Sequence, residues 1–203
     1  HTVFQSRVNG FLKYAVRDVS TGAWSVIQTI DADNNALGSF LDLEIDSAGR
    51  PGVAYFDAHN GGLRYAQLNI ERNQWEKHVV DAVQSVGLYP SLTFTGSNAA
   101  IIAYYHRTRG ALRIATQQPT SWAIETFASA GDQGRFSQIQ RDPNRPDLNS
   151  RYVIAWSNTT TARAHYAFLD GTWKHEVVND PMVDGATYLS LAFYDTGSGV
   201  TGQ

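Results

Sequence analysis

Apolar and polar residues alternate in short runs along the whole chain. The runs are rich in β-branched and aromatic residues, as in "GVAYFD" (52–57) and "LRYAQLN" (63–69). Clusters of Gly, Asn, Asp, Ser and Pro separate them, which is typical of strands joined by tight turns. No stretch keeps the 3.6-residue apolar period of a helix. The pattern therefore predicts an all-β fold with almost no helix.

Four markers recur four times in constant order. One is a Gly-aromatic segment such as "GSFLDL" (38–43), followed by segments such as "AYFD" (54–57) and "LRYA" (63–66). The last is a tryptophan that opens an alternating run, at intervals of 51, 47 and 51 residues: Trp24, Trp75, Trp122 and Trp173. Four strands in each repeat of about 50 residues predict the blade of a β-propeller, with the first strand innermost.

The two ends of the chain align with different strands of the repeat. "TVFQSR" (2–7) matches a second strand, whereas "YLSLAFYD" (188–195) matches a first strand. We therefore expect a closed four-bladed ring, in which the C-terminal strand pairs with the N-terminal one and leaves no open sheet edge. One domain (1–203) would divide into these blades: 189–203 plus 1–37, 38–86, 87–133 and 134–188. Two alternatives stay open, a fragment of a longer array and half of an eight-bladed ring shared by two chains; we expect a monomer.

Composition excludes several classes of protein. With 203 residues, 42% of them apolar, the chain is long and apolar enough to bury a sizeable core. A net charge of −3 with scattered charges provides no basic surface for nucleic acid. No apolar run approaches the roughly 18 residues of a membrane helix. Cysteine is absent, so disulfides and thiolate metal sites are impossible.

The repeat pattern resembles that of known propellers. Its elements are Gly-x-aromatic, Asp-x-x-Gly-x-Pro, Ala-Tyr-aromatic-Asp, Leu-Lys/Arg-Tyr-Ala and a Trp, and the second repeat (38–86) matches best. They resemble repeats of secreted bacterial and archaeal propellers of the sialidase-like (BNR-like) and lectin-like groups. The resemblance implies a propeller fold and a secreted or cell-surface location, and it implies little about activity because function depends on sites rather than folds.

Two columns of side chains are expected on the face that carries the turns between second and third strands and the connections between blades. The aromatic column, on the innermost strands, is Phe40, Tyr89, Phe136 and Tyr188. The polar column, closing the second strands, is Ser6, Asp57, His106 and Asn158, with Tyr104 and Trp156 among the aromatic residues two positions earlier. The columns have a structural interpretation, as core packing and turn caps. Their functional interpretation is a site for a carbohydrate or another polar ligand.

We expect a non-catalytic module that binds a glycan or a protein, rather than an enzyme. One alternative is a glycan-active hydrolase or lyase that would use Asp57, His106, Arg107 and Tyr104 at the channel mouth. Another is a structural unit of a larger surface protein. The Ser-x-Asp-x-Gly-x-x-Trp box of sialidases is missing, and the six histidines lack a metal-binding spacing such as His-Glu-x-x-His. No cofactor is therefore expected, although an ion such as calcium in the channel stays open.

Overall fold

The protein is built of antiparallel β-sheets, as the alternating pattern predicts. A computed structural model describes residues 1–34, 36–83, 85–142, 152–178 and 189–193. Within these ranges the chain forms fifteen strands and one short 3₁₀ helix, η1 (Arg107–Arg109). Three sheets have four strands and one has three, and in each sheet the strands lie side by side in chain order. The described part is therefore a series of blade-like units.

Each sheet corresponds to one repeat. The first contains β1 (Thr2–Gln5), β2 (Leu12–Ala15) and β3 (Gln28–Asp31). The second contains β4 (Leu37–Ile45), β5 (Pro51–Asp57), β6 (Gly62–Asn69) and β7 (Gln74–Asp81). The third contains β8 (Val86–Phe94), β9 (Ala100–His106), β10 (Ala111–Gln117) and β11 (Trp122–Ala128). The fourth contains β12 (Gln133–Arg141), β13 (Tyr152–Asn158), β14 (Arg163–Asp170) and β15 (Thr172–Val178).

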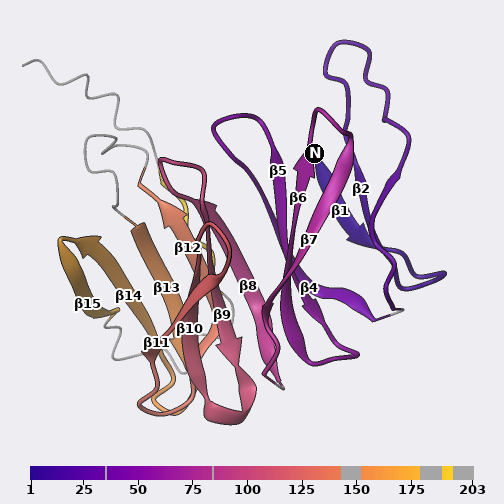
Figure 1. Ribbon diagram of the computed structural model, residues 1–203. Coiled ribbons are helices and arrows are strands. Elements are labelled where there is room, and N and C mark those ends of the chain that lie inside the picture. The colour runs from indigo at the N-terminus through magenta and orange to yellow at the C-terminus, as the bar shows by residue number, and fades with distance from the viewer. Residues whose placement is uncertain (35, 84, 143–151, 179–188, 194–203) are drawn as a thin grey trace, which may run out of the picture.

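The sheets follow one another in a row, with the first and the fourth at opposite ends (Figure 1). Strand β8 contacts both β4 and β12, so the first strand of each repeat lies on the inner side, as predicted. The hydrophobic core is split into three clusters, one between each pair of successive sheets. This arrangement resembles propeller blades packed face to face.

Tryptophan provides the most regular contact between sheets. Trp75 packs edge-on against Tyr14 of the preceding sheet, with ring centroids 5.1 Å apart. Trp122 does the same on Tyr65 at 5.5 Å, and Trp173 packs on Phe127 at 4.8 Å. These three of the recurring tryptophans therefore pack between successive sheets. Edge-to-face aromatic pairs add roughly 0.5–1.5 kcal/mol to the area that they bury.

Closure of the ring is not shown. The first sheet has three strands, and residues 189–193 form no strand in the described part of the chain. They lie beside β12, where Gln140 Nε2 donates to the Leu191 carbonyl at 2.8 Å. The predicted pairing of the C-terminal strand (188–195) with the N-terminal strand stays a prediction, and residues 188, 194 and 195 of it lie outside the described residues. Among those that are described, no helix is long and apolar enough to cross a membrane.

Glycine at the start of an inner strand permits close packing on the preceding sheet. Gly134 has φ +104°, and a Cβ there would lie 2.7 Å from the Leu112 Cα atom. Gly87 has φ +91°, and a Cβ there would lie 2.8 Å from the Leu63 Cα atom. Both positions need glycine for two reasons, since the backbone conformation disfavours other residues and the neighbouring backbone leaves no room.

We expect Gly134→Ala to lower the free energy of unfolding by roughly 3 kcal/mol or more, because strain at positive φ is combined with a clash against backbone. Gly171→Ala is the matched control: its φ is +68° and nothing lies within 4 Å of the added methyl group, so only the conformational cost of roughly 1–2 kcal/mol applies. Urea unfolding of both variants measures the difference. Equal losses would contradict the packing role of Gly134.

Candidate functional site

A hollow of about 350 Å³ opens where the inner strands of three sheets meet residues 189–193. Its walls come from corresponding positions of β4, β8 and β12, so each repeat contributes the same part of its sequence. The lining residues are Ser39, Phe40, Leu41, Tyr89, Pro90, Phe136, Ser137, Gln138 and Leu189. Three of the four residues of the predicted aromatic column thus gather at one site, and the fourth, Tyr188, lies outside the described residues.

The three aromatic rings form a continuous row across the inner strands. Phe40 and Tyr89 have ring centroids 4.6 Å apart, and Tyr89 and Phe136 have centroids 4.5 Å apart. All three side chains are half-buried, so each ring packs on its neighbour and still exposes part of its surface. The row is an apolar floor on which the flat face of a ligand could lie.

The backbone under this row is bulged. Leu88 pairs with Tyr105 and Ser91 pairs with Ala103, so β8 contains one more residue than β9 between these pairs. Strand β12 has the same irregularity between Arg135 and Gln138. Tyr89 and Phe136 occupy the left-handed region, with φ of +50° and +54°. Left-handed backbone at bulky residues is uncommon and is often found at functional sites, and bulges re-aim side chains. Here they turn aromatic rings toward the hollow.

Hydrogen bonds between inner strands hold the hollow in shape. The carboxylate of Asp42 accepts the Leu92 N–H at 2.7 Å, and the corresponding Ser91 Oγ accepts the Ile139 N–H at 3.0 Å. Burial raises the pKa of Asp42, and the hydrogen bonds from Leu92 and Leu43 oppose that rise. These polar residues, two positions after the aromatic column, therefore connect one sheet to the next.

Three polar side chains of the hollow have groups to offer a ligand. In the described part of the chain, the Ser39 hydroxyl, the Tyr89 hydroxyl and the Gln138 amide make no hydrogen bond. Among the described residues that line the hollow, none has a charged side chain. A few neutral polar groups around an aromatic floor are typical of a small-molecule site. Ser39 was not among the residues expected from the sequence, because the bulges were not predicted.

The polar column closes the turns between second and third strands. The Asp57 carboxylate accepts the His59 and Asn60 N–H groups, both at 3.1 Å, and Asn158 Oδ1 accepts the N–H groups of Thr160 and Thr161. His106 Nδ1 accepts the Arg109 N–H at 3.2 Å at the start of η1. Ser6 occupies the same position and bonds through its backbone to Phe11 and Gly10. The structural interpretation, turn capping, accounts for these contacts of Asp57, His106 and Asn158.

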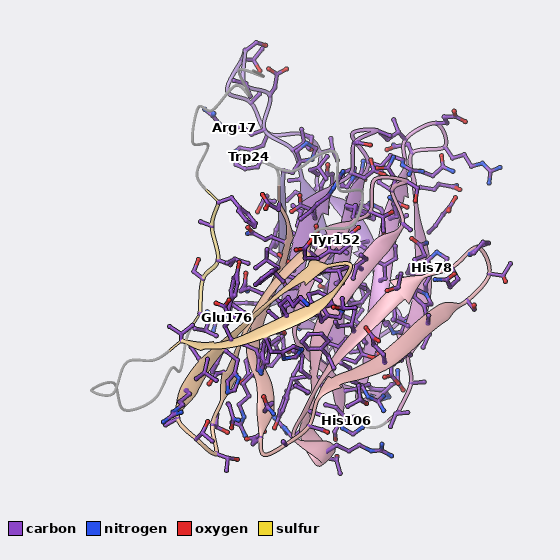
Figure 2. The ribbon with its side chains drawn as sticks, turned by 90° about the vertical axis from the view of Figure 1, so that its left-hand side faces the viewer. Arg17, Trp24, His78, His106, Tyr152 and Glu176 are labelled. Carbon is purple, nitrogen blue, oxygen red and sulfur yellow. The ribbon has the colours of Figure 1, made fainter. Side chains whose placement is uncertain are left out.

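Figure 2 shows that the two ends of the sheets are well separated, with His106 at one end and Arg17 and Trp24 at the other. The capped turns therefore share the face of His106. They are connected there to the loops that enter the next sheet: Val86 N–H donates to the Gly61 carbonyl, and Gln133 N–H donates to the Gly110 carbonyl. Among the described residues, none from these turns lines the aromatic hollow.

Asp57 is also held by an ion pair. Arg64 Nε lies 2.7 Å from the Oδ2 atom of Asp57, and Arg64 Nη1 reaches Asp31 and Asp33. Burial alone would raise the pKa of Asp57, but the hydrogen bonds from Asn60 and the Arg64 charge outweigh it and lower the pKa. The carboxylate is therefore ionised and already partnered.

The third repeat differs at this position. His106 replaces the carboxylate, and Arg113 corresponds to Arg64 and pairs with Asp81 at 2.7 Å. Within the described residues, Arg113 Nε and His106 Nε2 are buried and have no hydrogen-bond partner. Burial and the Arg113 charge lower the pKa of His106. A buried donor without an acceptor costs roughly 1–3 kcal/mol, so this turn is a weak point of the fold.

We expect His106→Asp to raise the free energy of unfolding at pH 7 by roughly 1–2 kcal/mol, because a carboxylate there gives Arg113 Nε the partner that Arg64 has in the second repeat. His106→Asn is the matched control: it retains a turn acceptor, as at Asn158, but adds no charge. Chemical unfolding compares the two. If the aspartate variant is no more stable than the asparagine variant, the two repeats do not use this position alike.

His106 is also expected to make the free energy of unfolding depend on pH. Its folded pKa lies below the ordinary value near 6.5, so its contribution is fully present above about pH 6.5 and is lost as the pH falls toward the folded pKa. We therefore expect His106→Asn to lose less stability than the parent protein between pH 7 and 5. Unfolding at both pH values tests this, and equal losses would contradict it.

The remaining predicted residues are in the core. Tyr104 is buried and donates its hydroxyl to Asp81 Oδ2 at 2.8 Å, and Trp156 is buried and donates Nε1–H to Gln133 Oε1 at 2.9 Å. Neither side chain reaches the hollow. The set suggested for an enzyme (Asp57, His106, Arg107 and Tyr104) therefore includes a carboxylate held by Arg64 and a phenol held by Asp81. We derive no catalytic step from it.

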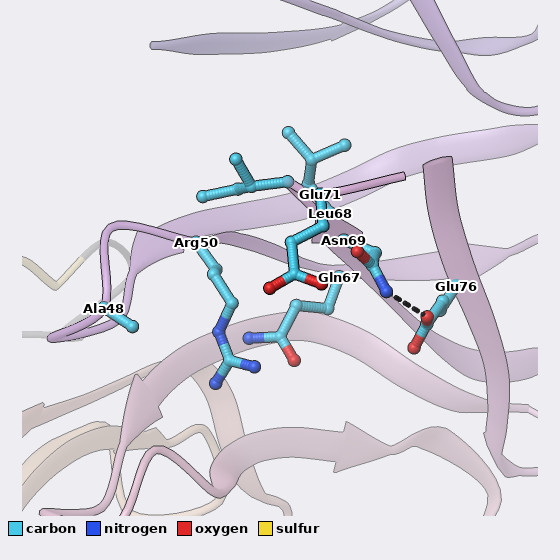
Figure 3. A pocket seen from close by; sticks show the side chains of 8 residues that line it. Ala48, Arg50, Gln67, Leu68, Asn69, Glu71 and Glu76 are labelled. Carbon is cyan, nitrogen blue, oxygen red and sulfur yellow. Dashed lines mark hydrogen bonds between the residues drawn. The ribbon is translucent and has the colours of Figure 1, made fainter. Parts of the chain in front are cut away.

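A second hollow, of about 410 Å³, lies at the outer turns of the second sheet (Figure 3). Several of its polar side chains already have partners. Arg50 Nε bonds to Asp46 at 2.7 Å, Gln67 donates to the same carboxylate at 3.1 Å, and Asn69 donates to Glu76 at 2.9 Å. A ligand there would have to break these contacts, so the aromatic hollow is the stronger candidate site. Across the described ranges, no group of three or more His, Cys, Asp or Glu residues could hold a metal ion.

Comparison with known proteins gives a likeness in fold. No protein-family model matches the chain, and no curated protein sequence matches it. Among solved structures, a mutant of the Aleuria aurantia lectin in complex with α-methyl-L-fucoside is similar, with 17% sequence identity and a TM-score of 0.57. The match covers 89% of this chain and 57% of the lectin chain.

Two further structures are similar. The intramolecular trans-sialidase of Ruminococcus gnavus, in complex with oseltamivir carboxylate, matches at 12% identity and a TM-score of 0.55, over 88% of this chain and 42% of that enzyme. A fucose lectin of Kordia zhangzhouensis, in complex with methyl-fucoside, matches at 15% identity over 67% of this chain and 96% of its own, with a TM-score of 0.43. The Aleuria lectin and the trans-sialidase support the fold resemblance expected from the repeats. This chain spans little more than half of the Aleuria lectin.

Proposed function

We propose that the protein is a non-catalytic module that binds a neutral carbohydrate in the aromatic hollow. The observation that carries this proposal is the row of Phe40, Tyr89 and Phe136, bordered by unpaired neutral polar groups. A pyranose ring has an apolar C–H face and a rim of hydroxyl groups. The negative face of an aromatic ring attracts the C–H face of the sugar, and amide and hydroxyl side chains form hydrogen bonds with its hydroxyl groups.

The charge of the lining supports a neutral ligand. An acidic sugar would call for a cation at the site, and the described residues of the lining include no charged side chain. The fold likeness to a fucose-bound lectin agrees with this choice but does not select the sugar. Tyr89 and Phe136 hold their conformation before any ligand binds, which reduces the entropy lost on binding.

A glycan array with purified protein is the first test, with α-methyl-L-fucoside as the first titration probe. We expect Gln138→Ala and Tyr89→Phe each to lower the affinity for a bound glycan about five- to tenfold, since each removes one hydrogen bond. Phe40→Ala removes a stacking surface and is expected to lower affinity more than tenfold. Titration calorimetry measures these changes, and thermal unfolding verifies that each variant is folded.

Glu71→Gln is the control, because it changes a side chain of the second hollow. It is expected to leave the affinity unchanged. Binding that survives all three changes in the aromatic hollow would place the glycan site elsewhere. An array without any bound glycan would contradict the proposal and favour a protein ligand or a structural role.

A further inference from the structure

The first two junctions between successive sheets each contain an ion pair with a buried carboxylate. Across the first junction, Arg64 Nη1 lies 3.4 Å from Asp31 Oδ2. Across the second, Arg113 Nη1 lies 2.7 Å from Asp81 Oδ2. A buried tyrosine of the following sheet also donates its hydroxyl to each carboxylate. Carboxylates and guanidinium groups keep their charges between about pH 5 and 8, so we expect both ion pairs to persist over that range.

The third junction replaces both members of that pair. The strand register places Ala128 where the two carboxylates stand in the preceding sheets. It places His165 where the two arginines stand, next to Trp156 in place of a tyrosine. An imidazole thus stands at the contact of the third and fourth sheets where the other contacts have an ion pair.

Aromatic rings fill this third junction. The His165 ring stacks on Trp156, with centroids 5.3 Å apart and planes inclined by 21°. The His175 ring of β15 stacks on Phe127 of β11 at 4.9 Å and 17°, and it lies edge-on to Trp156 at 5.8 Å. Trp173 also packs on Phe127. Two imidazole rings are therefore part of the aromatic cluster that joins the fourth sheet to the third.

His165 has a buried nitrogen without a partner. Within the described residues, its Nε2 atom is shielded from solvent and makes no hydrogen bond. The charges that act on the ring are those of His175 beside it and of Arg163 on its own strand. Burial and these two neighbours lower the pKa of His165, so the ring is neutral at pH 7.

No carboxylate of the described residues pairs with His165. The titratable side chains of the third sheet that face the fourth are Glu125 of β11 and Tyr105 of β9, and neither is bonded to His165. Glu125 is exposed, Tyr105 donates to Asp132, and Arg135 of β12 pairs with that same carboxylate. The core side chains that β10, β12 and β13 contribute here are apolar: Leu112, Ile114, Ile139 and Ile154. A proton added to His165 therefore has no counter-charge.

We propose that the junction between the third and fourth sheets is an acid-sensitive contact, which opens before the other two junctions when His165 takes up a proton. Because its folded pKa is lowered, the contribution of His165 to stability is fully present above about pH 6.5 and is lost as the pH falls toward the folded pKa. Units of a repeat protein can open separately, so the ion-paired sheets are expected to stay packed.

Hydrogen exchange followed by mass spectrometry tests this sheet by sheet, at pH 7 and 5 and after correction for intrinsic exchange rates. At pH 5 we expect the fourth sheet (133–141, 152–158 and 163–178) to lose protection about three- to thirtyfold more than the second sheet (51–81). The ordinary histidine pKa near 6.5 sets the upper limit, because an exposed imidazole at pH 5 is about thirtyfold more protonated than neutral. No ligand is needed, so the result does not depend on the function proposed above.

Three variants assign the effect to His165. His165→Gln cannot take up a proton and is expected to remove the extra loss of protection at pH 5. Ala128→Asp restores a carboxylate at the position of the other junctions, so the charged imidazole gains a partner and the loss is expected to disappear. His78→Gln is the matched control, because His78 is exposed and stacks on Tyr65 at 6.2 Å in the second sheet. It is expected to behave like the parent. His106 is present in all four proteins and contributes equally to each.

Equal losses of protection in the second and fourth sheets of the parent would overturn the proposal, and so would an unchanged loss in His165→Gln. Greater protection of the fourth sheet at pH 5 would show that the stacked ring favours the proton, which also overturns it. An NMR titration of the His165 ring in the parent gives a readout that needs no variant. The pKa is expected below 6.5, and a value at or above 6.5 contradicts the proposal.

Discussion

The contact of one sheet with the next is the interaction on which the rest of the structure depends. No sheet here can bury both of its faces alone, and the core consists of three clusters between sheets. Each contact combines a tryptophan edge on the preceding sheet with a buried aromatic side chain, and in two cases with a tyrosine hydroxyl on a carboxylate. Stability is therefore expected to depend on neighbours, as in other repeat proteins.

The aromatic hollow follows from that packing. Glycines at the start of β8 and β12 bring these strands against the preceding sheets, and the bulges that follow turn Tyr89 and Phe136 inward. Asp42 and Ser91 then join each inner strand to the next. The site is thus composed of aromatic residues from equivalent positions of several repeats. The contacts that join successive sheets also fix the positions of these residues.

Much of the fold could be predicted from the sequence, because strand alternation and the recurring tryptophans are local signals. The gathering of Phe40, Tyr89 and Phe136 could be predicted as well, since equal positions of successive repeats lie side by side. The place of the Ser39 hydroxyl in the hollow could not be predicted, because Ser39 lies at a bulge and a bulge depends on how two strands pair. The ligand role predicted for His106 stays a prediction, and in the structure its ring caps a turn. The sequence alone did not indicate that Arg113 Nε lacks the carboxylate partner that Arg64 has in the second repeat.

The central claim is that a glycan binds on the aromatic row at the inner strands. Amide chemical-shift mapping by NMR tests it most directly, with a glycan identified on an array added to labelled protein. The account predicts shifts concentrated in residues 38–41, 87–90 and 134–138, which come from three different sheets and line one hollow. Shifts confined to the outer strands, or to the hollow between Arg50 and Glu76, would contradict it.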